Sequence, residues 1–356
     1  MKKTICYISL LFVLAIAAVS CADQNEFDTS AFRKGAFDRW MEKYHPGIPR
    51  LTGQNAGIYM EWLERGPEKS RLREGYWFLL DYTAREQNGD VFYTRSGAVA
   101  HQIFGASFDY SVHYVPEQIQ YKPDSLMYYY AQGQIRALSL MNEGDSVRLY
   151  LPPSQGFWGG FGFTYSTESH FGYSPSASYL SPDRGMIVDM RLNRIIKDIY
   201  LYEREEVERY AAEKFGITNP ADSVVLGVYA KKTVENPAGE AVKAGSVVDI
   251  FYAGRFLDGH VFDTNDTEVG EENHVSASGS SLTVVVGAAS VIPAMDAVLL
   301  GMRAGERATF VTVSDQAYGM NGSTNETYGY VVIPPYTPLV FDIYVESVEN
   351  VEEEDS

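Results

Sequence analysis

"GYVVIPPYTPLVFDIYVESV", residues 329–348, sets three prolines directly before an apolar strand. Over 340–348, β-branched, aromatic and apolar side chains alternate with polar ones, which predicts a β-strand with a buried face. Pro334, Pro335 and Pro338 lie just upstream, and proline cannot donate a hydrogen bond to a sheet ladder. The prolines therefore predict a rigid approach to the strand. A sheet alone could require it, and it would also supply the fixed wall of a binding pocket.

The composition limits the number of domains and the kinds of partner that the chain can have. The chain has 356 residues, of which 45% are hydrophobic, so it is long enough for two or three domains with packed cores. It carries 29 basic and 47 acidic residues, a formal net charge of -18. Nucleic acids and anionic membrane surfaces attract clustered lysine and arginine, so this balance argues against both as partners. The acidic residues at 351–356 are expected to form a solvated tail.

The first 21 residues have the features of an export signal. Lys2 and Lys3 precede an apolar run, residues 5–19, that is short for a transmembrane helix. Small residues and then Cys21 end the run, and a polar segment follows, which resembles a bacterial lipoprotein signal. That resemblance implies a lipidated Cys21 at the start of the mature chain. We then expect an anchor in the bacterial cell envelope, in the outer membrane, facing the periplasm or the cell surface. The alternative is an ordinary cleaved signal with a chance cysteine.

Cysteine chemistry is excluded in the mature chain. The sequence has two cysteines, Cys6 and Cys21, and Cys6 lies inside the signal. A single remaining cysteine cannot form an intramolecular disulfide and supplies no thiolate set for zinc. Stability must then come from burial, and we expect no metal site and no cofactor.

The chain contains an internal repeat, which decides its domain organisation. Residues 79–94, LLDYTAREQNGDVFYT, match residues 249–264, DIFYAGRFLDGHVFDT, so that Tyr82 falls on Tyr252. Two later pairs of segments match in the same order: 139–159 on 299–319, and 186–192 on 339–345. The separation shrinks from 170 to 153 positions along the chain, which predicts longer insertions in the first copy.

Helical patterns precede both copies. Residues 203–217 place Val207, Tyr210, Ala211 and Phe215 on one face, with Gly216 as a stop. Residues 31–47 do the same with Phe37, Trp40, Met41 and Tyr44, and the helix is expected to end before Pro46. A further short helix at 293–302 begins with proline in its first turn. Short alternating strands make up the rest, so we predict an α+β fold of two mainly antiparallel sheets, each wrapped on a short helix.

The second copy carries motifs that together resemble one family. The motifs are VDIFYAGRFLDGHVFDT (248–264), VVVGAASVIPAMDAVLLGMRAGERATFVTVSDQAYG (284–319) and VVIPPYTPLVFDIYVESV (331–348). They resemble the FKBP-type peptidyl-prolyl isomerases over roughly 245–348. In that family a bent antiparallel sheet wraps a short helix and an apolar pocket lies between them. The double proline then follows the aliphatic residues of one pocket wall.

The resemblance implies the site residues. The expected catalytic residues are Tyr252, Phe262, Asp263, Tyr318 and Phe341. The expected substrate-binding residues are Leu282, Val291, Ile292, Met295, Val332 and Ile333. Many members of the family have tryptophan on the pocket floor where this chain has Met295, which is apolar but smaller and flexible, so weaker activity is expected. The loop between Tyr318 and Val332 is also longer than in the simplest members and offers Tyr328 and Tyr330 as substitutes at the pocket edge.

Such a site needs no nucleophile, metal or proton transfer. An X–Pro bond is nearly balanced between cis and trans, yet it rotates slowly because amide resonance must be broken. Water stabilises the planar, dipolar amide, so an apolar pocket that removes water favours the twisted form. The resemblance implies that Tyr318 donates a hydrogen bond to the substrate backbone. It places Asp263 at the rim, where it accepts a hydrogen bond or orients Tyr252.

The first copy has lost most of these residues. Tyr93 stands where the second copy has Asp263, and Phe157 or Trp158 stands where it has Tyr318. Residues 178–185, SYLSPDRG, replace the double-proline loop. The apolar alternation survives, so we expect the fold without the isomerase site, and a role in binding or positioning.

Other features point to no further chemistry. The six histidines show no metal-ligand spacing and are expected at the surface: His45, His101, His113, His170, His260 and His274. The acidic stretch 263–272 lacks the ordered spacing of a calcium loop and is expected to be a solvated flap. The glycine-rich stretch 156–163 lacks a phosphate-binding lysine. The tyrosines within 127–132 are expected to pack on a strand face, with an exposed surface for peptides or sugars as the alternative.

These observations lead to one interpretation and two alternatives. We expect a lipid-anchored prolyl isomerase that assists the folding of proline-containing exported polypeptides. The alternatives are a non-catalytic FKBP-like chaperone or binding module, and a surface lipoprotein that binds a glycan or a host protein. Oligomeric state is left open. The expected boundaries are a signal peptide (1–21), a helical lead-in (22–56), a degenerate FKBP-like domain (57–197), a linker helix (198–223), an isomerase domain (224–350) and the acidic tail (351–356).

Overall fold

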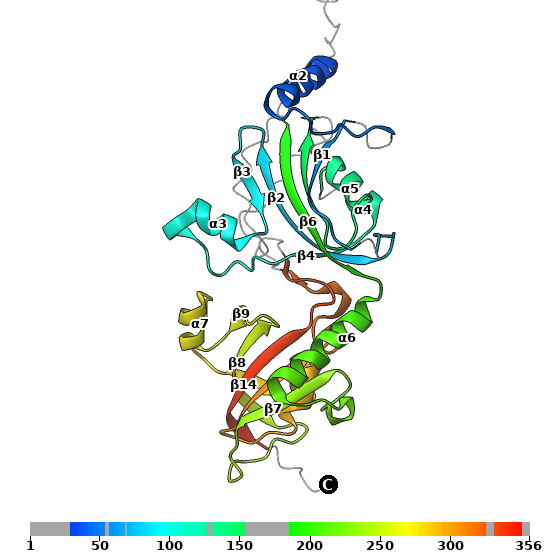
Figure 1. The fold of residues 1–356 in the computed structure, drawn as a ribbon. Coiled ribbons are helices and arrows are strands. Elements are labelled where there is room, and N and C mark those ends of the chain that lie inside the picture. The colour runs from blue at the N-terminus through cyan, green and yellow to red at the C-terminus, as the bar shows by residue number, and fades with distance from the viewer. Residues whose placement is uncertain are drawn as a thin grey trace, which may run out of the picture.

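The computed structural model describes residues 29–53, 57–67, 70–126, 130–153, 185–324 and 331–350. Two six-stranded antiparallel sheets lie one beyond the other along the molecule (Figure 1). We call the described residues up to Ile196 the first half and those from Ile199 the second half. Among the described residues, no helix has the length and apolar character needed to cross a bilayer.

The first half begins with a helix and builds the first sheet. Its elements are α2 (Thr29–Tyr44), β1 (Tyr59–Glu64), β2 (Trp77–Glu86), β3 (Val91–Thr94), α3 (Gly97–Phe104), η2 (Gly105–Ser107), β4 (Glu117–Gln120), α4 (Pro123–Leu126), α5 (Gln132–Leu138), β5 (Ser146–Leu151) and β6 (Met186–Ile196).

The second half begins with the linker helix and builds the second sheet. Its helices are α6 (Ile199–Tyr210), η4 (Ala211–Phe215), η5 (Pro220–Asp222), α7 (Thr267–Asn273), α8 (Pro293–Leu299), η6 (Ser314–Gln316) and η7 (Gly319–Asn321). Its strands are β7 (Val228–Val234), β8 (Val247–Phe256), β9 (Val261–Thr264), β10 (Leu282–Val285), β11 (Arg307–Thr312), β12 (Ser323–Thr324), β13 (Val331–Ile333) and β14 (Leu339–Glu349).

The two sheets have the same strand order. The first runs β1-β5-β6-β2-β3, with β4 also on β2, and the second runs β7-β11-β14-β8-β10, with β9 also on β8. Thr83 pairs with Asp189 in the first sheet, and Ala253 pairs with Asp342 in the second. These pairs are separated by the 170 and 153 positions of the sequence repeat. The α+β fold of two related sheets, each with a short helix against it, is confirmed.

Strand β14 forms where the alternating pattern predicts it. Phe341, Ile343 and Val345 point into the core beneath α8, whereas Val340 packs on the other face of the sheet. That outer face is covered by α6, which Figure 1 shows lying along the second sheet. The second sheet is therefore covered on both faces near the start of β14, which explains why Val340 is buried although it lies on the face opposite Phe341.

The linker helix also agrees with its pattern. Asp198 caps α6 by accepting a hydrogen bond from the backbone N–H of Leu201. The predicted apolar face is buried or half-buried against the sheet, and after one π-helical turn Gly216 ends the helix with a φ of 77°.

The face predicted for the first helix is correct except at its end. Phe37 and Met41 of α2 are buried against Tyr150, but Tyr44 is 56% exposed. The reason is that His45, just after the helix, packs at a tilt on Tyr150 with ring centroids 4.5 Å apart and takes the place that the periodicity gave to Tyr44. His45 is thus part of a packed contact.

Two expectations are corrected, and several fall outside the described residues. The acidic stretch 263–272 is no flap: Asp266 accepts hydrogen bonds from Glu268 N and Val269 N and caps helix α7. His113 is buried rather than at the surface. The predictions for Cys21, Tyr128, Tyr129, the glycine-rich 156–163 with Phe157 and Trp158, His170, residues 178–184, Tyr328, Tyr330 and the tail lie outside the described residues.

Candidate active site

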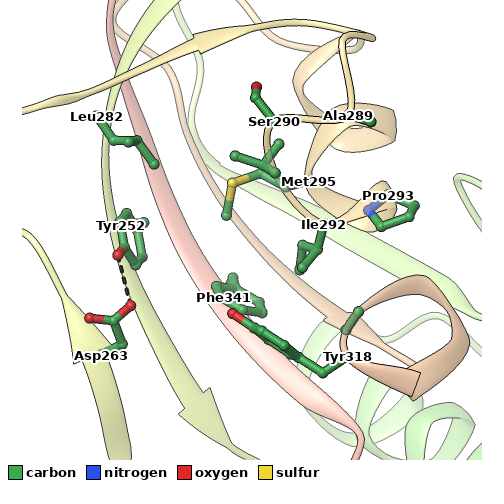
Figure 2. A pocket seen from close by; sticks show the side chains of 12 residues that line it. Tyr252, Asp263, Leu282, Ala289, Ser290, Ile292, Pro293, Met295, Tyr318 and Phe341 are labelled. Carbon is green, nitrogen blue, oxygen red and sulfur yellow. Dashed lines mark hydrogen bonds between the residues drawn. The ribbon is translucent and has the colours of Figure 1, made fainter. Parts of the chain in front are cut away.

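A cavity of about 430 Å³ lies in the second half between the sheet and helix α8, a size typical of small-ligand sites (Figure 2). Its lining is contributed by strands β8, β9, β10 and β14, by the first turn of α8 and the turn before it, and by the segment after η6. The lining residues are Tyr252, Asp263, Leu282, Ala289, Ser290, Val291, Ile292, Pro293, Met295, Ala317, Tyr318 and Phe341.

The polar groups of the cavity lie on two opposite sides of Phe341. Figure 2 shows Tyr252 and Asp263 on one side and Tyr318 on the other. The Tyr252 hydroxyl donates a hydrogen bond to Asp263 Oδ2 at 2.8 Å. Burial, then this bond and the carboxylate charge, raise the pKa of Tyr252 well above its ordinary range. Burial likewise raises the pKa of Tyr318, so both phenols are hydrogen-bond donors at neutral pH.

The position of Tyr252 is fixed by two small polar residues at the end of β9, Thr264 within the strand and Asn265 just after it. Thr264 Oγ1 donates to the carbonyl of Tyr252 at 2.6 Å, and Asn265 Oδ1 accepts from its N–H at 2.8 Å. Asn265 also donates to the carbonyls of Ile250 and Ser280, at 3.0 and 3.1 Å. Because every polar atom of this buried amide has a partner, it holds the strand rigidly.

The floor of the cavity is apolar and tightly packed. Met295 is 4% exposed and Phe341 3% exposed, and Phe310 stacks beneath Phe341 at 5.3 Å. A side chain at Gly254 would place its Cβ 2.5 Å from the ring of Phe262. Glycine is therefore required there so that Phe262 can pack across the strand and support Phe341.

The turn before α8 forms a third wall. Pro293 occupies the first turn of the helix, where no backbone N–H is needed. Asp296, one turn later, accepts a hydrogen bond from Gly287 N at 3.1 Å and ties the turn to the helix. Ala289 has a φ of 54°, an uncommon value for a residue with a side chain, and lies at the cavity edge.

The structure brings together most of the predicted site residues. Eight border the cavity: Tyr252, Asp263, Leu282, Val291, Ile292, Met295, Tyr318 and Phe341. Phe262 and Val332 are half-buried and Ile333 is buried, all packed in the core beside these residues rather than on the cavity surface. Their assigned roles remain predictions.

Sequence reasoning missed part of the lining and the support behind it. Ala289, Ser290, Pro293 and Ala317 border the cavity, and Thr264 and Asn265 hold Tyr252. The three in 289–293 flank the predicted Val291 and Ile292, so their position was a usable signal. Nothing in the local pattern marks Asn265, because its partners come from other strands.

Comparisons with known proteins identify a family for the part of the chain that carries this cavity. The family model described as FKBP-type peptidyl-prolyl cis-trans isomerase matches residues 238–346. FK506-binding protein 2 of Yarrowia lipolytica is 30% identical over 125 residues, which cover 35% of this chain and 75% of that protein. The chain belongs to the FKBP-type family.

Two further similarities have limited coverage. FK506-binding protein 3 of Dictyostelium discoideum is 30% identical over 129 residues, 35% of this chain, so the FKBP match spans 58% of the length of that relative. The crystal structure of a peptidyl-prolyl cis-trans isomerase from Pseudomonas syringae pv. tomato is 27% identical and superposes with a TM-score of 0.33. That comparison covers 43% of this chain and 94% of the other.

The corresponding place in the first half of this FKBP-family chain is filled. Tyr93 pairs with Ala84 as Asp263 pairs with Gly254, and Glu117 lies opposite Leu80 as Leu282 lies opposite Ile250. The hydroxyls of Tyr93 and Tyr130 both donate to the carboxylate of Glu117.

This polar network is buried except at Glu117, whose side chain is half-buried. Tyr82 stacks on Tyr93 at 4.6 Å, and the side chain of Arg95, 1% exposed, lies 3.6 Å from Glu117. Gln134, the third residue of α5, is fully buried where α8 has Met295. Protein side chains therefore occupy the place in the first half that corresponds to the cavity of the second half.

Proposed function

We propose that the cavity of the second half catalyses the rotation of X–Pro bonds in polypeptide substrates. The observation that carries the proposal is an apolar floor, Met295 and Phe341, set between the phenols of Tyr252 and Tyr318. The floor accepts a proline ring and excludes water from the adjoining amide. Loss of water destabilises the planar, dipolar amide relative to the twisted one.

The two phenols would hold the substrate backbone in a turn. The hydroxyl of Tyr318 points toward the cavity, and within the described part of the chain no charged side chain bonds to it, so it is the donor for a substrate carbonyl. The hydroxyl of Tyr252 is engaged by Asp263, which orients it. A thousandfold acceleration needs about 4 kcal/mol of preferential binding to the twisted amide, which shape and desolvation can supply.

The test is a prolyl isomerisation assay on a short Xaa–Pro peptide with the chain from Ala22. We expect acceleration by the wild type and a loss of at least about tenfold in a Tyr318→Phe, Asp263→Ala variant. Tyr344→Phe is the matched control, because Tyr344 lies on the same sheet outside the cavity lining. Equal rates in the double variant and the control would contradict the assignment.

We further propose that the protein acts on exported chains from the bacterial cell envelope. The support is the apolar run before Cys21, which resembles a lipoprotein signal. Incorporation of labelled fatty acid into the wild type but not into Cys21→Ala would support the anchor. Recovery of unlabelled, cleaved wild-type protein in the soluble fraction would leave an ordinary export signal instead.

A second candidate function is a holding module that binds proline-containing segments without turnover. It is favoured by Met295 on the floor and by exposed apolar side chains near the cavity: Leu282 at 39%, Met320 at 63% and Val331 at 40%. Suppression of client aggregation by a folded wild type that accelerates no isomerisation would select this function over catalysis.

A further inference from the structure

The first half contacts the second half behind both walls of the cavity. We propose that these contacts hold the two walls of the cavity at a fixed separation, with Gln118 and His113 as positioning residues. We call this role of the first half a brace. The inference rests on the proposed isomerase function. It assigns to the filled first half a mechanical role in place of a second substrate site.

The first contact is on the loop that follows the double proline. Gln118 of β4 donates from Nε2 to the carbonyl of Pro335 at 2.8 Å and to that of Tyr336 at 3.3 Å. The ring of Tyr336 lies between two aromatic side chains. Trp77 of β2 meets it edge to face at 5.1 Å, and Tyr200 of α6 does so at 5.2 Å. Figure 1 shows β4 lying next to this loop, where the two halves meet.

This contact is connected to the cavity wall by one backbone hydrogen bond. Tyr336 has a φ of 54°, which costs free energy in a residue with a side chain and is kept only where its surroundings enforce it. In this conformation its N–H donates to the carbonyl of Gly319 at 3.0 Å. Gly319 directly follows Tyr318. Gln118 and Trp77 thus hold Tyr336, and Tyr336 holds the segment that carries the Tyr318 side chain.

The second contact is on the turn between β8 and β9. His113, 7% exposed, lies with Nε2 2.7 Å from Asp258 Oδ2, and its ring stacks on Phe256 at 4.4 Å and on His260 at 4.5 Å. His260 Nε2 lies 3.1 Å from the carbonyl of Ser111. The turn therefore has two polar contacts, through Asp258 and through His260, with the same loop of the first half.

The second contact is connected to the opposite wall of the cavity through packed aromatic rings. Phe256 packs on Phe262 at 5.2 Å, and Phe262 meets the ring of Phe341, on the cavity floor, at 6.0 Å. Phe262 also directly precedes Asp263, the partner of Tyr252. One contact therefore acts on Tyr318 and the other on Tyr252 and Asp263, which Figure 2 shows on opposite sides of the cavity. Together they fix the separation between the two walls.

Full-length variants test the brace in pairs with matched controls. Gln118→Ala removes the bond to the loop, and Gln120→Ala is its control, since Gln120 is on the same strand but bonds to Gly75 within the first half. His113→Ala removes the hydrogen bond to Asp258 and the ring stack of the second contact and leaves the His260 contact with the Ser111 carbonyl. His101→Ala is its control, because the His101 ring packs at a tilt on Phe108 within the first half.

We expect kcat for the Xaa–Pro peptide to fall about 2- to 30-fold in Gln118→Ala and in His113→Ala, the range of couplings seen between distant sites. KM should change less than kcat, because the apolar floor that binds the proline ring is untouched. The controls should match the wild type. His113→Phe keeps the stack on Phe256 and should recover most of the loss, which a general folding defect would not allow.

Hydrogen exchange supplies a readout independent of activity. The amide of Tyr336 should exchange faster in Gln118→Ala than in the wild type and in Gln120→Ala, because its bond to Gly319 is no longer enforced. Unchanged kcat and unchanged exchange in Gln118→Ala would overturn the brace while leaving the proposed function intact. A folded wild type without isomerase activity would instead remove the proposed function, and the exchange comparison would then decide the brace alone.

Discussion

Glu117 and Leu282 occupy the same register position in the two sheets, one opposite Leu80 and the other opposite Ile250. Leu282 borders an open cavity, whereas Glu117 accepts hydrogen bonds from Tyr93 and Tyr130 inside a filled core. Where the second half has a leucine at this position, the first half has a carboxylate, and two tyrosine hydroxyls donate hydrogen bonds to it. The two halves have the same strand order. The space under the sheet is a cavity in the second half and is occupied by side chains in the first.

Replacement of Glu117 by leucine is expected to destabilise the first half without creating a site. Two buried phenols would lose their acceptor, and Arg95 would lose the carboxylate 3.6 Å away. Removing one member of a buried charged pair costs about 3–5 kcal/mol, and a loss at the lower end is expected here because the Glu117 side chain is 21% exposed. Urea unfolding should show a lower midpoint for Glu117→Leu, whereas Glu74→Leu, at an exposed position, should leave it unchanged. A wild-type midpoint in Glu117→Leu would show that the network is dispensable.

The repeat allowed more of the fold to be predicted than strand patterns alone. The matched positions of Tyr82 with Tyr252, and of Asp189 with Asp342, set the same register in both sheets, and the structure has it. Helices with one apolar face and clear stops, such as the one ending at Gly216, were also predictable. These features depend on residues near one another in sequence or on repetition.

What escaped prediction depends on distant contacts. The burial of His113 follows from its contact with Asp258, 145 residues away, and no local periodicity signals such a pair. The resemblance placed Val332 and Ile333 at the pocket wall, but a three-residue strand does not reveal which side chain enters the core. The filling of the first-half space was also hidden, because Tyr130 and Glu117 become partners only once the strands are assembled.

Replacement of Gly254 by alanine should damage the cavity floor. The added Cβ would lie 2.5 Å from the ring of Phe262 and 3.0 Å from that of Phe341, so both rings must shift. Overpacking of this kind costs about 1–3 kcal/mol. We expect a lower melting temperature and a lower kcat/KM. Gly301→Ala is the control, because its Cβ would meet only one atom, at 3.5 Å. Equal melting temperatures for the two variants would contradict the packing argument.

Replacement of Met295 by glutamine should reduce activity more than stability. It installs on the floor the residue that the first half has at the third position of its helix, Gln134. An amide on an apolar floor retains water or stays unpaired, at a cost of about 1–3 kcal/mol when a proline ring enters. We expect kcat/KM to fall roughly tenfold or more. Leu226→Gln, at a side chain that is 84% exposed and outside the cavity lining, should behave as the wild type, and a similar loss in both variants would exclude a specific role for the floor.

Glu203 should make the stability of the second half depend on pH. Its carboxylate is buried and accepts hydrogen bonds from the N–H and the hydroxyl of Ser314, three residues before Ala317 at the cavity. Burial raises the pKa of Glu203 above its ordinary value of 4.5, although the bonds from Ser314 oppose this. A raised pKa means that the folded state binds the proton more tightly than the unfolded state. The resulting stability is fully present below pH 4.5 and is lost as pH rises through the folded pKa.

Glu203→Gln separates this titration from the hydrogen bonds. Glutamine is neutral at every pH and its oxygen can still accept from Ser314 N, so the variant should gain stability relative to the wild type as pH rises. Urea midpoints at about pH 4.5 and about pH 7.5 measure the change, since the pKa of Glu203 is raised above 4.5 and the wild type should lose stability relative to the variant between them. Glu205→Gln on the exposed face of α6 is the matched control and should follow the wild type at both values. A difference between Glu203→Gln and the wild type that is the same at both pH values would mean that Glu203 does not titrate in this window, and that its effect on the Ser314 segment comes from hydrogen bonding alone.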